Sequence, residues 1–246
     1  MSTTPTLPNP SNTPEDLNSE RLPSQTPLLA VICLDCMEHQ NLTAFQEAFP
    51  AWKDGSHKRI RKVNGQPGIL LAHALDIHCN KTVVDELESY ERFYKAELRA
   101  AKTSHLIQFI CKPLEEGKEL PAQIRGLYGF FVEKIDGDRV KPLDKMLASA
   151  FDPKFADVIR SKSPLLYSVQ KNKDHTELIK DIIKLYQYAK TNGVYDLQGI
   201  YDGTHFTLID PPGLSLHPRA EQSQKLLWLL NCLNYFSSVK VDLTRL

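Results

Sequence analysis

The sequence predicts an α+β protein, and two features of the apolar residues carry that prediction. Short alternating or continuously apolar runs dominate up to about residue 135, whereas apolar residues at helical spacing dominate after it. A hydrophobic content of 41% over 246 residues is enough for a sizeable core, and no internal repeat is apparent. We therefore expect a strand-rich region over residues 27–135 and a mostly helical region over residues 136–246.

The charge balance and the cysteines limit the classes of function. Lys plus Arg and Asp plus Glu number 30 each, so no overall field favours nucleic acid or an anionic membrane. No apolar run approaches the roughly 20 residues of a membrane span, and the polar N-terminus does not resemble a secretion signal. Five scattered cysteines indicate reduced thiols. We expect a cytoplasmic protein with no nucleic-acid and no membrane partner. Cys33 and Cys36 fit two half-buried strand thiols, with a zinc or redox pair as the alternative.

The N-terminal segment differs in composition from the rest. Residues 1–26 are dense in Ser, Thr, Pro and Asn and hold almost no large apolar side chains. Such a segment cannot bury enough surface to offset the entropy of ordering, so we expect a disordered tail. Order is expected to begin at the apolar run of residues 28–34, which is consistent with a strand.

The strand-rich region is expected to contain one helix. Residues 59–63 and 69–75 flank turn residues and predict two paired strands, and residues 105–111 and 127–135 predict two more. Between these pairs, residues 82–101 predict an amphipathic helix whose apolar face is formed by Val83, Leu87, Tyr90, Tyr94 and Leu98. The simplest interpretation of its acidic residues is a solvated face made of Glu86, Glu88, Glu91 and Glu97.

The helical region is interrupted by a predicted hairpin. Helices are expected over residues 142–150, 177–190 and 219–236. Residues 200–209 predict the hairpin, because Asp202-Gly203 between two β-prone runs favours a two-residue turn. Asp196 precedes the first arm and Asp210 ends the second, so the two carboxylates could converge and hold a divalent metal. The alternative is that both aspartates simply end strands near turns.

This order of elements resembles the protein-kinase-like fold. Residues 131–137 look like its fifth strand and hinge, residues 192–198 like the helix end that runs into its catalytic loop, and residues 209–213 like its metal-binding segment in the Asp-Pro form of atypical and small-molecule kinases. The resemblance covers roughly residues 59–236. It implies a two-lobed fold, with a small antiparallel-sheet N-lobe carrying one helix and a reduced, mostly helical C-lobe.

The resemblance implies ATP and Mg²⁺ as cofactors and assigns roles near the hairpin. Asp196 would be the catalytic acid, and Asp210 would hold magnesium. Gln198 would be a second metal ligand, because Asp-Leu-Gln-Gly also resembles a motif of the alpha-kinases; a loop amide that satisfies backbone groups is the alternative. The cysteine and histidine zinc module of the alpha-kinases has no counterpart in this sequence.

The resemblance also implies nucleotide-binding residues in the strand-rich region. His73 stands where the fold's nucleotide-binding lysine is expected, with Lys81 as the nearest alternative, or His73 is a buried strand histidine. Glu88 is the candidate for the helix glutamate that pairs with that cation. Backbone groups at Glu133 and Ile135, in the hinge segment, would hold the adenine ring.

Three departures from the kinase pattern leave three functions open. Tyr201 replaces a metal-binding asparagine, His73 stands in place of the nucleotide-binding lysine, and no Gly-rich loop precedes the second strand. The first function is transfer of the ATP γ-phosphoryl group to a protein or small-molecule hydroxyl. The second is a pseudokinase that acts as a protein-interaction module, and the third is an ordinary α/β interaction protein with structural aspartates.

Overall fold

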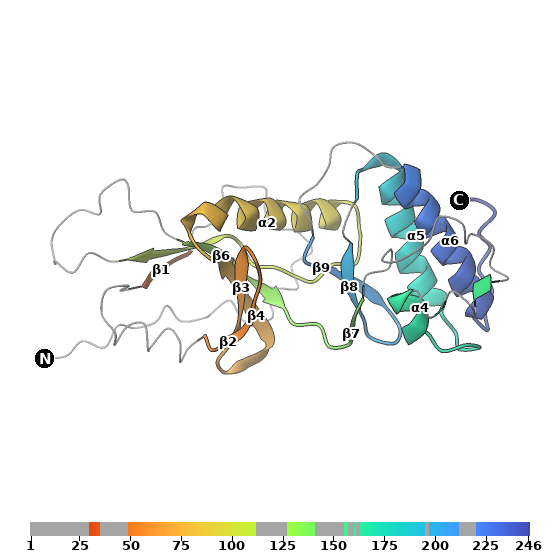
Figure 1. Cartoon of the computed structure of the whole chain (residues 1–246), viewed down its shortest axis with the longest axis horizontal. Coiled ribbons are helices and arrows are strands. Elements are labelled where there is room, and N and C mark those ends of the chain that lie inside the picture. Colours follow the sequence, from red (N-terminus) through yellow and green to blue (C-terminus); the bar gives the residue numbers. More distant parts are fainter. Residues whose placement is uncertain are drawn as a thin grey trace, which may run out of the picture.

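The computed structural model is an α+β protein with two sheets and helices beside each (Figure 1). It describes residues 30–34, 49–111, 127–140, 155–156, 160, 163–194, 197–211 and 220–246. The predicted disordered tail, the predicted helix over residues 142–150 and Asp196 lie outside these residues.

The larger sheet has six strands in the order β1-β5-β6-β4-β3-β2. Strands β1 and β5 pair in parallel, and the other neighbours pair antiparallel. The strands are β1 (Ala30–Leu34), β2 (Ala51–Asp54), β3 (Lys58–Val63), β4 (Gln66–Ala74), β5 (Ile107–Cys111) and β6 (Leu127–Glu133). The sheet is therefore mostly antiparallel, with β3 and β4 in the places of the two predicted paired strands.

Helix α2 (Asn80–Lys95) follows a short 3₁₀ turn, η2 (Ile77–Cys79), and covers one face of this sheet. It ends before the predicted limit of residue 101 because Glu97 adopts a left-handed conformation with φ 55°. The amide of Leu98 then donates to the carbonyl of Phe93 at 3.0 Å, a Schellman-type end. The apolar stripe of α2 packs on β4 and β6 through Val83, Leu87 and Tyr90 against Ala72, Ala74 and Phe130.

The smaller sheet contains β7 (Asp138–Val140), β8 (Gln198–Tyr201) and β9 (Phe206–Ile209) in that order. Strands β8 and β9 form a hairpin in which Tyr201 pairs with Phe206, so the loop has four residues rather than the predicted two. The reason is local, since Asp202 accepts hydrogen bonds from the amides of Thr204 and His205 at 2.8 and 2.7 Å. This side-chain turn lengthens the loop beyond the two-residue form.

Three helices pack around the smaller sheet: α4 (Pro164–Ser168), α5 (Thr176–Thr191) and α6 (Ala220–Phe236). Figure 1 shows α5 and α6 side by side. Their fully buried residues include Leu178, Ile182, Leu229 and Leu233. Of the helices in the described ranges, none combines the length and apolar character that crossing a bilayer requires.

The end of α2 joins the two regions. Phe93 and Leu98 are buried in the same core as α5 and α6, and the Phe93 ring meets the Tyr188 ring edge-on with centroids 5.8 Å apart. The chain after α2 pairs with β9, because Leu208 donates to Arg99 and its carbonyl accepts from Ala101, both at 2.9 Å. Strand β9 therefore ends next to α2 and the larger sheet.

Candidate active site

A half-buried ion cluster lies where β3, α2 and the end of β9 meet. The Lys58 ammonium lies 2.6 Å from both carboxylate oxygens of Glu86 and 2.5 Å from Oδ1 of Asp210. The side chains of Lys58 and Glu86 are only 16% and 7% exposed, and that of Asp210 is 34% exposed. One cation thus links the sheet, the helix and the hairpin.

Strand and helix periodicity explain why Lys58 and Glu86 meet. Side chains alternate along a strand, so Lys58 shares its face of β3 with Ile60, which packs into the core under α2. Glu86 lies one turn after Val83 and one turn before Tyr90, on the buried stripe of α2. The expected solvated face is therefore wrong for Glu86, whereas Glu88, Glu91 and Glu97 are exposed.

Asp210 has an unusual backbone. Its φ is 51°, a left-handed conformation that few non-glycine residues adopt and that aspartate tolerates better than most. The amide of Asp210 donates to the hydroxyl of the buried Tyr90 at 2.9 Å, which ties the end of β9 to α2. Uncommon backbone conformations of this kind persist only where the surrounding contacts hold them in place, and they cluster at functional sites.

The pKa values of the cluster favour a charged lysine and a charged aspartate. Burial lowers the pKa of Lys58, but the charges of Glu86 and Asp210 together outweigh burial and raise it. Burial likewise raises the pKa of Asp210, but Lys58 and then Arg139 outweigh it and lower the pKa. For Glu86, burial exceeds the attraction of Lys58, and its pKa is raised. The surroundings therefore favour the ionised form of Asp210 more than the ionised form of Glu86.

Arg139 of β7 contacts the two predicted metal ligands. Its Nη2 lies 3.1 Å from Oδ2 of Asp210 and also donates to Oε1 of Gln198. With Lys58 on Oδ1, each carboxylate oxygen of Asp210 faces a cationic side chain. Within the described part of the chain, no group of three or more His, Cys, Asp or Glu side chains is placed to hold a metal ion. Because Arg139 contacts an oxygen of both Gln198 and Asp210, and Lys58 contacts the other oxygen of Asp210, the described residues do not fit a divalent cation between Gln198 and Asp210.

In the structure, His73, Lys81 and Glu88 contact residues outside the Lys58 cluster. His73 is buried on β4, where its Nε2 accepts from Nε of Arg61 at 2.9 Å and its Nδ1 lies 2.8 Å from the carbonyl of Ala74. Lys81 is 81% exposed and pairs with Asp85 at 2.7 Å, one turn along α2. Glu88 is 55% exposed and lies 3.9 Å from Arg92.

The predicted hinge residues lie at the end of β6 and just after it, where the chain passes from the larger to the smaller sheet. The Glu133 amide donates to the carbonyl of Lys102 at 2.8 Å, and the Lys134 amide donates to the carbonyl of Gly68 at 2.8 Å. Ile135 is half-buried and packs against the core under α2. Residues 134–137 then lead into β7, which carries Arg139.

Lys58 and Arg139 are candidate residues that sequence reasoning missed. The first of the two predicted paired strands was expected to begin at residue 59, so Lys58 fell just outside it, whereas β3 begins at Lys58. Helical periodicity held a signal for Glu86 as the partner of Lys58, because Glu86 lies on the apolar stripe of the helix and Glu88 does not. For Arg139 we find no comparable local signal.

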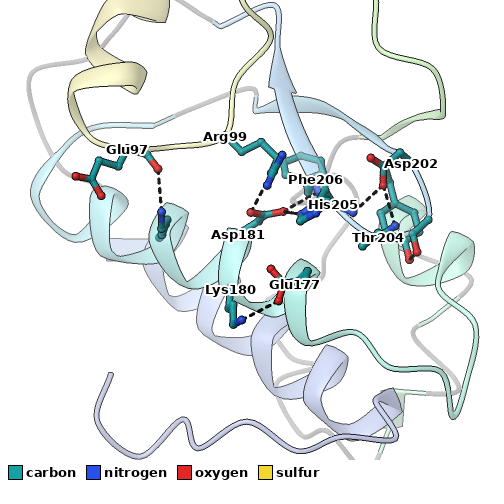
Figure 2. Close-up of polar contacts among 12 residues, drawn as sticks. Glu97, Arg99, Glu177, Lys180, Asp181, Asp202, Thr204, His205 and Phe206 are labelled. Carbon is teal, nitrogen blue, oxygen red and sulfur yellow. Dashed lines mark hydrogen bonds and ion pairs between the residues drawn. The ribbon is translucent and has the colours of Figure 1, made fainter. Parts of the chain in front are cut away.

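A second polar cluster fixes the hairpin to α5 (Figure 2). Asp181 of α5 accepts from Nε of Arg99 at 3.3 Å and from the Phe206 amide at 3.1 Å, and its Oδ2 lies 3.0 Å from Nδ1 of His205. The Asp181 side chain is only 12% exposed. Lys184 adds a contact to the carbonyl of Glu97 at 3.3 Å. These contacts hold the start of β9, and so support the position of Asp210 at its end.

No family model and no curated protein sequence matches this chain. Among solved structures, the chain is similar to an alpha kinase from Entamoeba histolytica, with a TM-score of 0.35 and 14% identity, over 65% of this chain and 61% of that one. The chain thus spans less than two thirds of that protein. It is also similar to the GDP and kanamycin complex of APH(2")-IIia, with a TM-score of 0.33 and 12% identity, over 85% of each chain. Both TM-scores are too low to establish a shared fold, so the proposed function depends on the contacts of the site residues.

Proposed function

We propose that the chain is a divergent kinase-like protein that transfers the γ-phosphoryl group of ATP to a hydroxyl of a protein or small molecule. The observation that supports it is the Lys58 ammonium held by Glu86 of α2 and by Asp210 after β9. In kinases, a strand lysine paired with a helix glutamate binds the nucleotide phosphates. In this proposal, residues 27–135 form the N-lobe and residues 136–246 the C-lobe.

The proposal assigns each site residue a chemical task. Lys58 would contact the ATP phosphates and neutralise developing charge, while Glu86 keeps its ammonium in place. Asp196 would orient the acceptor hydroxyl, and backbone groups at Glu133 and Ile135 would hold adenine. The proposal assigns phosphate binding to Lys58 instead of His73 or Lys81, because Lys58 has the glutamate and aspartate partners.

Two observations favour a second candidate, a pseudokinase that acts as a protein-interaction module. Tyr201 stands where a metal-binding asparagine is expected, and its hydroxyl donates to the Gly203 carbonyl at 3.0 Å within the hairpin loop. Arg139 contacts Asp210, which is the expected metal ligand. Both candidates share nucleotide binding at Lys58 and differ in whether the γ-phosphoryl group is transferred.

Calorimetric titration of ATP into the whole chain tests the shared part. We expect the wild type to bind ATP and Lys58→Met to lose at least about tenfold in affinity, equivalent to about 1.4 kcal/mol. Lys81→Met is the matched control, because it removes a lysine that is 81% exposed and pairs with Asp85 one turn along the same helix. Circular dichroism of each variant checks the fold.

The outcomes separate the candidate cations. A loss of ATP affinity in Lys81→Met with none in a folded Lys58→Met would overturn the assignment to Lys58. Absence of ATP binding by the wild type would overturn the proposed function. Release of labelled phosphate from the γ position by the wild type, but not by Lys58→Met, would distinguish the enzyme from the pseudokinase.

A further inference from the structure

The guanidinium of Arg139 is held at the point between the two predicted metal ligands. Its strand, β7, pairs with β8 through Arg139 and Ile200, and β8 pairs with β9 through Gln198 and Ile209. Gln198 and Asp210 therefore lie beside each other at the open end of the hairpin, and Nη2 of Arg139 contacts an oxygen of each. Three paired strands set this geometry.

The charges of this group balance without a metal ion. Lys58 and Arg139 each carry one positive charge, and Glu86 and Asp210 each carry one negative charge when ionised, which sums to zero. A divalent cation needs oxygen ligands with accessible lone pairs. It would have to displace Arg139 from Gln198 and Asp210, and it would be repelled by both cationic side chains.

We infer that Arg139 takes the place of a divalent cation between Gln198 and Asp210, so that nucleotide phosphates bind here without Mg²⁺. This inference rests on the proposed function, and it specifies the ligand as a nucleotide that carries no metal. An arginine has five N–H donors, and both contacts described use one nitrogen of a side chain that is 42% exposed. Phosphate oxygens are good acceptors for the same planar group. Arg139 and Lys58 would each donate hydrogen bonds to phosphate oxygens.

Titration of ATP in excess EDTA and in excess MgCl₂ tests the inference. For the wild type we expect equal affinities within about twofold, which is well below the tenfold that corresponds to about 1.4 kcal/mol. For Arg139→Gln we expect at least about a tenfold loss in EDTA and a partial recovery in MgCl₂, because a metal ion can then reach Asp210. Arg92→Gln is the matched control, since Arg92 lies on the exposed face of α2, 3.9 Å from Glu88.

Each result has a separate meaning. Wild-type binding only in MgCl₂ would overturn this inference and leave the proposed function standing. If Arg139→Gln, like the wild type, bound ATP with equal affinity in EDTA and in MgCl₂, the role of Arg139 would be overturned. Absence of ATP binding by the wild type in both buffers would overturn the proposed function and this inference with it.

A metal titration without nucleotide gives a second test. Mn²⁺ alone is the probe, and its electron paramagnetic resonance signal reports the free ion. We expect Asp210→Asn and the wild type to bind Mn²⁺ equally, because Arg139 and Lys58 already contact the Asp210 oxygens in the wild type. A wild-type Mn²⁺ site that Asp210→Asn removes would overturn the inference.

Discussion

At the scale of single residues, Lys58 is the cation that links two acidic residues of the candidate site. Its ammonium contacts the carboxylates of both Glu86 and Asp210. Removing a carboxylate leaves Lys58 one partner, whereas removing Lys58 leaves Glu86 beside Asp210 without the cation between them. Removing one partner of a partly buried ion pair lowers stability by more than the pair itself contributes, because the remaining charge is left without its partner.

We therefore predict that Lys58→Met lowers the free energy of unfolding by about 3 kcal/mol. The matched control is Lys62→Met, which changes an exposed lysine of the same strand and should stay within about 0.5 kcal/mol of the wild type. Urea denaturation followed by circular dichroism measures both. Equal stabilities of the two variants would contradict the structural role of the ion cluster.

The pH dependence of stability provides an independent check on Asp210. Because the fold lowers the pKa of Asp210 below its ordinary value of 3.8, ionisation of this group stabilises the folded chain. That contribution is fully present above pH 3.8 and is lost as the pH falls through the lower, folded-state pKa. The difference in unfolding free energy between the wild type and Asp210→Asn should therefore shrink below pH 3.8. A difference that stays constant across this range would contradict the assignment.

At the scale of elements, the β8–β9 hairpin begins at Gln198, leads into Asp210 and is tightly packed. A Cβ added at Gly199 would lie 2.3 Å from Cζ of the Phe206 ring and 2.8 Å from the carbonyl oxygen of Thr207. Phe206 is itself buried, so the ring has little room to move. Glycine at position 199 is thus required by the close approach of the two strands.

We predict that Gly199→Ala lowers the free energy of unfolding by about 1–3 kcal/mol, the usual cost of overpacking a core. Gly68→Ala is the control, because an added Cβ there meets no atom within 4 Å. Thermal denaturation of both variants measures the effect. An unchanged melting temperature for Gly199→Ala would show that β8 and β9 are less closely packed than described.

At the scale of the whole molecule, α2 belongs to two cores. Its middle packs on the larger sheet through Leu87 and Tyr90, while Phe93 is fully buried with residues of α5 and α6. The site lies along this helix, since Glu86 and Tyr90 contact Lys58 and Asp210. We expect the two regions to unfold together because they share α2.

This expectation is testable with the two tryptophans of the chain, Trp52 on β2 and Trp228 on α6. Single-tryptophan forms made by Trp→Phe substitution should give coincident urea transitions. Phe93→Ala should lower stability by about 3–5 kcal/mol and separate the two transitions. Tyr167→Ala, at a side chain that is 71% exposed, is the control and should leave them coincident. Coincident transitions in Phe93→Ala would contradict the coupling.

Local sequence determined most of the elements of this chain. Periodicity predicts the helices near α2, α5 and α6, the paired strands near β3 and β4, and the β8–β9 hairpin, because these patterns depend on neighbours within a few positions. Two boundaries differ from the predicted ones. Helix α2 ends earlier because Glu97 is left-handed, and the hairpin loop is longer because of the side-chain turn at Asp202.

Only the tertiary structure decided the candidate site. The Lys58 partners Glu86 and Asp210 are 28 and 152 positions away, and Arg139 and Gln198 are 59 positions apart. The resemblance to the kinase-like fold suggested His73 or Lys81 as the cation and Glu88 as its partner. Which charges meet depends on strand register, on the face of α2 that is buried and on how β9 ends beneath it. A few positions of local pattern do not encode these long-range contacts, whereas the packed core determines them.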